Sequence, residues 1–167
     1  NQDFTPWPVP PLNKKSGPFA GAASETLAFM CGPFLKKLEA GYPLGAGRDN
    51  RSILGYSLGG LFALWSFYES GVFGGCASCS GSLWYDGWLD YAKSKAPPLC
   101  TRVYLSLGRN EEKARNPRMA AVGCITREYA GLLNENKAVQ TTLAWHEGGH
   151  FNDVPARLAH AIAWLLG

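Results

Sequence analysis

Several features are missing from this sequence of 167 residues. It has no apolar run long enough to cross a bilayer and no signal peptide at its front, so we expect no membrane partner and a cytoplasmic location. Its 16 basic and 13 acidic residues give a net charge of +3 without a basic stripe, which argues against a nucleic-acid partner. Repeats, linkers and low-complexity tracts are absent too, which favours one domain over residues 1–167.

Cysteine is scarce and odd in number. Five cysteines at irregular spacing do not make a disulfide framework, which favours a reducing compartment. Cys76 and Cys79 form a C-x-x-C pair, but there is no second pair to complete a zinc site, and their small apolar surroundings are typical of a buried strand. We therefore expect structural thiols at these positions, and no metal or other cofactor.

Apolar spacing predicts alternating helices and strands after a proline-rich, extended segment over residues 1–20. The expected helices cover residues 22–40, with a kink or a division into two shorter helices at Pro33, then 58–70, 117–134 and 153–166, the last one capped by Asp153. Residues 84–95 are expected to form a loop and an amphipathic helix. The expected strands cover residues 51–55, 74–80, 102–107 and 139–145. This alternation predicts an α/β fold, a three-layer sandwich with a mostly parallel sheet between helices. Four strands are few for a complete sheet of this kind.

The strongest motif is G-Y-S-L-G at residues 55–59. It fits G-x-S-x-G, in which the serine occupies a strained strand-to-helix turn with its hydroxyl above the carboxyl edge of the sheet. Glycine at 55 and 59 would remove side chains where the strand and the helix come close. The simpler alternative is a turn whose serine only caps a helix. Because a strand is expected before the turn and a buried helix after it, we favour Ser57 as a nucleophile, with the Leu58 N–H as an oxyanion donor.

His150 is the expected base for Ser57. It lies in a loop between the last strand and the last helix, where a histidine can reach the carboxyl edge of the sheet, whereas His146 ends the strand and His160 lies within the helix. Residues 146–150 also spell H-E-x-x-H, the zinc-peptidase signature. That signature needs a helix, and here a strand leads into two adjacent glycines, so we do not expect zinc.

The triad acid is expected after the strand over residues 102–107, because the chain order is serine, acid, histidine. Two adjacent carboxylates, Glu111 and Glu112, follow that strand, and either could orient the imidazole. The residues alone leave the choice open, with Asp86, Asp90 and Asp153 as weaker candidates.

Together these stretches resemble the putative esterase (esterase D-like) family of α/β-hydrolases, which includes the enterochelin and other siderophore esterases. The matching segments are DFTPWPVPP, GYSLGGLFALWS, SCSGSLWYDGW, LSLGRNEEKARNP and GGHFND. The resemblance implies that Ser57 is the nucleophile, His150 the base and Glu111 the carboxylate, and that Trp84 lines the substrate cleft. An aromatic residue at position 84 could equally belong to the core.

The sequence departs from the family at its front. Family members carry earlier strands and a second oxyanion donor, and no HGGG-like stretch precedes Ser57 here. We therefore expect an N-terminally incomplete α/β-hydrolase sheet, whose exposed edge a second copy or another partner would cover.

The expected function is cleavage of a carboxylic ester, a small-molecule substrate, through an acyl-enzyme on Ser57. Two alternatives stay open. One is an acyltransferase that passes the acyl group to a sugar or an alcohol, and the other is a non-catalytic hydrolase-fold fragment.

Overall fold

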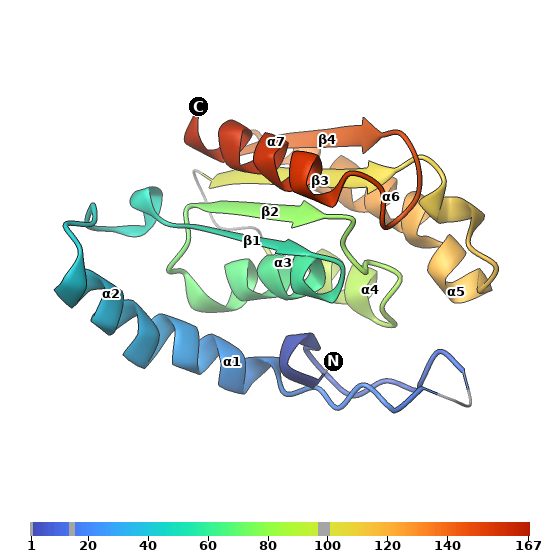
Figure 1. The fold of residues 1–167 in the computed structure, drawn as a ribbon, viewed down its shortest axis with the longest axis horizontal. Helices are drawn as coiled ribbons and strands as arrows, with labels where there is room; N and C mark the ends of the chain where they lie inside the picture. The colour runs from blue at the N-terminus through green and yellow to red at the C-terminus, as the bar shows by residue number, and fades with distance from the viewer. Residues whose placement is uncertain (1, 14–15, 97–100) are drawn as a thin grey trace.

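The computed structural model describes residues 2–13, 16–96 and 101–167. Within them, four strands form one parallel sheet in the order β1-β2-β3-β4 (Figure 1). The strands are β1 (Ser52–Tyr56), β2 (Gly75–Cys79), β3 (Thr101–Gly108) and β4 (Val139–His146), and each neighbouring pair runs parallel. The predicted α/β class with a parallel sheet is confirmed, and all four carboxyl ends meet at one edge.

Helices cover both faces of the sheet (Figure 1). On one face, α3 (Leu58–Ser70) packs on β1 and β2, and α6 (Val122–Glu135) packs on β4 and β3, with α4 (Trp88–Ser94) against α6. On the other face, α7 (Val154–Leu166) packs on β1, β2 and β3. The three predicted layers are therefore present.

Strand register assigns each side chain to one of the two faces. Ile53, Cys76 and Val103 are neighbours across β1, β2 and β3 and belong to the larger core under α3 and α6. The next set of neighbours points the other way, because side chains alternate along a strand, and Ala77 and Tyr104 form the smaller core under α7. Cys76 and Cys79 are both buried in these cores, as expected for structural thiols, while Cys100 lies outside the described residues.

The first helical region is interrupted at the predicted place. α1 (Ala23–Phe29) and α2 (Leu35–Gly41) are joined by a π-helical turn, η2 (Met30–Phe34), that contains Pro33. Proline has no N–H to donate, and a wider turn accommodates its ring. Short 3-10 turns complete this part of the chain at η1 (Gln2–Phe4) and η3 (Arg48–Asn50).

Two predictions about the later helices need correction: one helix is divided in two, and one predicted cap is missing. The helix expected over residues 117–134 consists of α5 (Pro117–Ala120) and α6, and the Asn116 side chain accepts hydrogen bonds from the Arg118 and Met119 N–H groups at its start. Asp153 precedes α7 but makes no side-chain cap hydrogen bond, so the predicted cap is wrong. The Asp153 backbone is left-handed (φ 50°, ψ 37°), whereas a capping residue normally takes the β region.

β1 lies at one edge of the sheet. Among the described residues it pairs with β2 alone, so its other side has no strand beside it. A cavity of about 570 Å³ runs along that side, between β1 and the N-terminal residues Phe4 and Met30. Within the described residues, β1 is therefore an edge strand.

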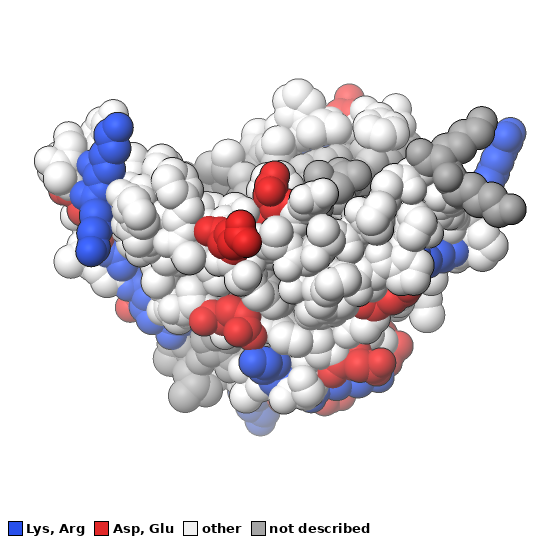
Figure 2. All heavy atoms as spheres, turned by 90° about the horizontal axis from the view of Figure 1, so that it is seen from below, with Lys and Arg blue, Asp and Glu red and all other residues white. Residues whose placement is uncertain are grey.

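On the face drawn in Figure 2, acidic and basic side chains are scattered among uncharged atoms and form no basic stripe. No helix in the part of the chain that the structure describes has the length and apolar character needed to cross a membrane.

Candidate active site

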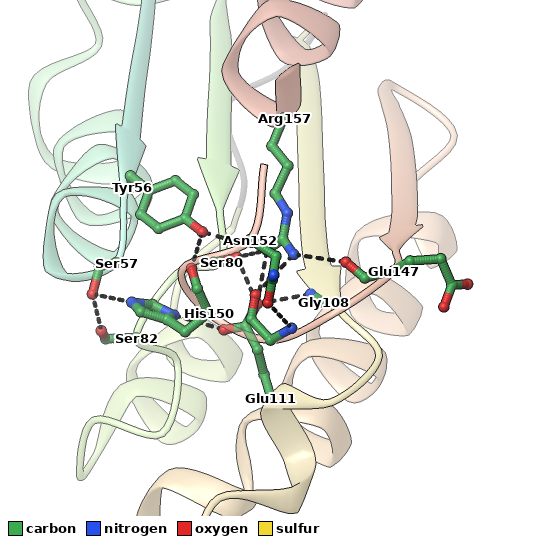
Figure 3. Close-up of polar contacts among 11 residues, drawn as sticks. Tyr56, Ser57, Ser80, Ser82, Gly108, Glu111, Glu147, His150, Asn152 and Arg157 are labelled. Atoms are coloured by element: carbon green, nitrogen blue, oxygen red, sulfur yellow. Dashed lines mark hydrogen bonds and ion pairs between the residues drawn. The ribbon is translucent and has the colours of Figure 1, made fainter. Parts of the chain in front are cut away.

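Ser57 lies on a strained turn between β1 and α3. Its backbone has φ 58° and ψ −123°, a region that residues other than glycine rarely occupy. Strain of this kind persists where the surroundings hold it, and it often marks a functional site. The turn presents the Ser57 hydroxyl at the carboxyl edge of the sheet, as the G-x-S-x-G motif predicts (Figure 3).

The glycines of the turn differ in how much they are needed. A Cβ on Gly55 would lie 1.9 Å from the Gly59 carbonyl oxygen, so a side chain cannot fit where β1 meets α3. Beyond its chain neighbours and the backbone of its own helix, a Cβ on Gly59 would meet no described atom within 4 Å, so the prediction that this position must lack a side chain is wrong. The second tight position is Gly60, where a Cβ would lie 2.8 Å from Ser78 Oγ.

His150 reaches Ser57 from the loop between β4 and α7. Its Nε2 lies 3.0 Å from Ser57 Oγ, within hydrogen-bond distance. The loop turns through Gly148 (φ 85°), and the Gly149 N–H donates to Asn152 Oδ1 at 2.8 Å. The Tyr56 hydroxyl donates to the His150 carbonyl, which ties this loop to the end of β1.

The other two histidines lie away from Ser57. His146 ends β4 and His160 lies on α7, and their rings stack with centroids 5.7 Å apart. Burial and the nearby Arg157 charge lower the pKa of His146. Residues 146–150 form a strand end and a loop, not the helix that a zinc-peptidase signature requires. The described residues contain no cluster of His, Cys, Asp and Glu placed to hold a metal ion.

Glu111 contacts the second nitrogen of the imidazole. Its Oε2 lies 2.7 Å from His150 Nδ1. Its Oε1 accepts hydrogen bonds from Ser80 Oγ at 2.6 Å, the Gly108 N–H at 2.7 Å and Arg157 Nη1 at 3.1 Å. Burial raises the pKa of Glu111, but the hydrogen bonds from His150, Ser80 and Gly108 outweigh it, so the net pKa lies below the usual value. The carboxylate is thus held in its charged form.

The neighbouring Glu112 points elsewhere. Both glutamates belong to a 3-10 turn, η4 (Glu111–Lys113), which sends their side chains in different directions. Glu112 Oε2 forms an ion pair with Arg127 Nη2 at 2.7 Å, on the surface beside α6. Of the two sequence candidates, the structure brings Glu111 to Ser57 and His150 and leaves Glu112 outside.

Four more side chains join this cluster, and sequence reasoning did not select them: Tyr56, Ser80, Ser82 and Arg157. Ser82 Oγ lies 3.4 Å from Ser57 Oγ, and the left-handed backbone of Ser80 (φ 46°) aims its hydroxyl at Glu111. The sequence contains a signal for Arg157, because it is the one strongly basic or acidic residue in α7, where His160 is the only other polar side chain. A cation in a helix that packs on a sheet must find buried partners.

Two cavities flank Ser57. The first, of about 180 Å³, is lined by residues from the loops after β2 and β3, among them Ser82 and Trp84, and by Met119 of α5 and Val122 at the start of α6. The second is the cavity along the open side of β1, which Leu58 and Gly59 also line. Trp84 is 8% exposed and packs on Phe19, so it belongs both to the cavity wall and to the core. Leu58 is the first residue of α3. Its backbone N–H therefore lies at the positive end of the helix dipole, next to Ser57.

Comparison with known proteins gives consistent matches. A family model described as "Putative esterase" matches residues 3–154. The uncharacterized protein YbbA of Bacillus subtilis is 25% identical over 171 residues, which cover 99% of this chain and 68% of that protein.

Solved structures show the same fold. An IroE-like serine hydrolase from Shewanella oneidensis superposes with a TM-score of 0.78 at 18% identity, covering 96% of this chain and 54% of the other. The siderophore hydrolase EstA of Aspergillus nidulans gives 0.77 at 23% identity, covering 98% and 64%. The chain thus spans between about half and two thirds of the length of these two proteins. The likeness confirms the predicted α/β-hydrolase-type fold.

Proposed function

This chain belongs to the putative esterase family, and we propose that it cleaves a carboxylic ester with Ser57 as nucleophile, His150 as general base and acid, and Glu111 as the carboxylate that orients His150. One observation carries the proposal. A single imidazole lies 3.0 Å from Ser57 Oγ on one side and 2.7 Å from Glu111 Oε2 on the other. This is the arrangement that activates a serine hydroxyl.

The geometry supports a two-step reaction. Nε2 of His150 takes the Ser57 proton while Oγ attacks the ester carbonyl, and the negative charge moves to the carbonyl oxygen. The protonated imidazole then gives its proton to the departing alcohol oxygen as the C–O bond breaks, which leaves an acyl-enzyme on Ser57. Water repeats the sequence and releases the acid, with His150 again taking and returning the proton.

Glu111 has two tasks in this scheme. Its hydrogen bond to Nδ1 fixes the tautomer in which Nε2 can accept a proton, and its charge stabilises the imidazolium that forms. The Leu58 N–H, at the start of α3, supplies one donor to the oxyanion.

The nature of the ester is part of the proposal. Solved relatives include a siderophore hydrolase, so a siderophore ester is the first natural substrate to test beside simple p-nitrophenyl esters. Trp84 in the first cavity offers an apolar face to an acyl or aromatic group. Product analysis with and without an added alcohol separates hydrolysis from acyl transfer.

A fluorophosphonate probe tests the nucleophile directly. We expect stoichiometric labelling of the folded protein and loss of labelling in Ser57→Ala. Ser66→Ala is the matched control, since it makes the same change at a buried position of α3, the helix that follows Ser57, away from the site, and should label like the wild type. Folded protein that takes no label, or Ser57→Ala that labels fully, would rule out the proposed mechanism.

A further inference from the structure

Arg157 is buried behind the three proposed catalytic residues. Its residue exposure is 0%, and it enters the cluster from α7 on the face of the sheet opposite α3 (Figure 3). Burying a guanidinium is costly unless its donors are satisfied, so its partners show what the residue is held for.

The guanidinium donates to five acceptors. Nη1 lies 2.7 Å from Ser80 Oγ, 3.1 Å from Glu111 Oε1 and 3.3 Å from the Tyr56 hydroxyl. Nη2 lies 2.9 Å from the Gly149 carbonyl and 3.3 Å from the Glu147 carbonyl. A planar fork of this kind can fix several acceptors at once, which a lysine ammonium cannot do in the same geometry.

These acceptors belong to the parts that hold the proposed triad. Glu111 is the proposed acid, and Gly149 immediately precedes His150 in its loop. Tyr56 immediately precedes Ser57, and its hydroxyl accepts a hydrogen bond from Arg157 and donates one to the His150 carbonyl. One side chain therefore joins the end of β1, the turn after β3 and the loop after β4.

We propose that Arg157 is a positioning residue for the triad, which supplies the permanent counter-charge to buried Glu111 and holds the His150 loop in place. This inference rests on the proposed function. Arg157 touches neither Ser57 nor the cavities in the contacts described, so it acts through Glu111 and the loop.

The need for a permanent charge follows from the resting state. In the proposed mechanism a neutral His150 accepts the Ser57 proton, so without Arg157 the Glu111 carboxylate, whose side chain is 5% exposed, would have no cation beside it at that stage. Arginine stays protonated at any working pH, so the charge of Glu111 remains balanced whichever state His150 is in.

Other titratable groups face this pair and enter its pH dependence. Tyr56 and His150 face it from β1 and the loop after β4. Cys79 on β2 and His146 on β4 both lie within reach of the Arg157 charge. Burial raises the pKa of Cys79, whose ionised form would be an anion, and burial lowers the pKa of His146, so neither supplies a cation that could replace Arg157 near pH 7.

The test compares Arg157→Met with Arg102→Met. Arg102 contacts the other end of α7, where its guanidinium donates to the Trp164 and Leu165 carbonyls and stacks on the Trp164 ring. Its loss should therefore weaken the packing of α7 on the sheet without changing the contacts of Glu111. On a p-nitrophenyl ester we expect Arg157→Met to lower kcat by about tenfold to hundredfold with KM nearly unchanged. The acid limb of its pH profile should move to higher pH, because Glu111 takes up a proton more readily. Arg102→Met should keep the wild-type profile.

A second readout needs no turnover. The proton shared by His150 Nδ1 and Glu111 gives a far-downfield proton NMR signal in a well-held pair, and it should vanish in folded Arg157→Met and persist in Arg102→Met. If Arg157→Met does not fold, Arg157→Lys takes its place, with the same signal weakened and a smaller loss of kcat.

The outcomes separate the two proposals. A folded Arg157 variant that keeps the signal and the pH profile overturns the positioning role, and so does an equal loss in Arg102→Met. Full labelling of Ser57→Ala overturns the proposed function instead, while the NMR comparison still reports whether Arg157 holds the Glu111–His150 pair.

Discussion

The carboxylate of Glu111 and the guanidinium of Arg157 form a buried ion pair, with 3.1 Å between Oε1 and Nη1 and side-chain exposures of 5% and 0%. The two oxygens of the Glu111 carboxylate therefore have different hydrogen-bond partners. Oε1 is held by Arg157, Ser80 and the Gly108 N–H, so Oε2 is left to face His150.

Replacing Glu111 by glutamine should lower ester turnover by about 10²-fold to 10⁴-fold, because an amide neither stabilises the imidazolium nor fixes the productive tautomer. Glu112→Gln makes the same change one residue along and removes a surface ion pair with Arg127. Such pairs contribute about 0–1 kcal/mol, so this variant should keep near-normal turnover and stability. Steady-state kinetics of the two variants decide the assignment, and equal losses in both would refute it.

The lowered pKa of Glu111 predicts how stability depends on pH. A carboxyl group whose pKa is lower in the folded protein than in the unfolded chain contributes stability above the unfolded pKa, about 4.3. That contribution disappears as the pH falls through the folded pKa. Urea unfolding at a series of pH values should therefore show the wild type losing more free energy of unfolding on acidification below about pH 5 than Glu111→Gln loses.

Glu25→Gln is the control for this series, since Glu25 is an exposed carboxylate at the start of α1. It should follow the wild-type pH dependence. Parallel curves for the wild type and Glu111→Gln would mean that the carboxylate adds nothing to stability.

The glycines of the serine turn predict opposite results for the same substitution. Gly55→Ala should destabilise the fold by about 1–3 kcal/mol or more and abolish fluorophosphonate labelling, because its methyl group would overlap the Gly59 carbonyl. Gly59→Ala has open space and a helical position, so it should fold and gain up to about 1 kcal/mol. Thermal unfolding and labelling of both proteins test this. A tolerated alanine at position 55 would contradict the turn geometry.

The two thiols of the C-x-x-C pair should be unreactive toward alkylating reagents in the folded protein. Burial and the neighbouring Cys79 raise the pKa of Cys76 well above its usual value, and the reactive thiolate is correspondingly rare. Iodoacetamide at neutral pH should modify the exposed Cys124 and leave Cys76 and Cys79 unmodified until urea is added. Mass spectrometry of peptides locates each adduct, and rapid modification of Cys76 in native protein would revive a redox role.

Much of this architecture can be predicted from the sequence, because local patterns carry it. The alternation of apolar strands and helices gives the parallel sheet, and the interruption at Pro33 follows from a missing N–H. Ser57 and His150 can be found from motif and loop position, since the strand ends of a parallel sheet meet at one edge.

The features that local sequence patterns could not predict depend on the direction in which single side chains point and on contacts between distant segments. The residues alone do not distinguish the adjacent Glu111 and Glu112, and only the family resemblance points to Glu111, because the 3-10 turn decides which one faces His150. The role of Arg157 depends on acceptors from three separate segments, which no local pattern reveals. Likewise, Gly60 rather than Gly59 is the tight position, because the limit is set by Ser78 on the neighbouring strand.

The two cavities beside Ser57 are built by different stretches of the chain. Apart from Ser57 and His150, which also line it, the smaller has walls from residues 80–122, and the larger has walls from residues 4–62. An ester held at Ser57 with its acyl part on one side and its alcohol part on the other would meet walls that share almost no residues. Selectivity for the acid and selectivity for the alcohol could then change independently, and libraries restricted to one segment should retune one half of the substrate while leaving the other as it was.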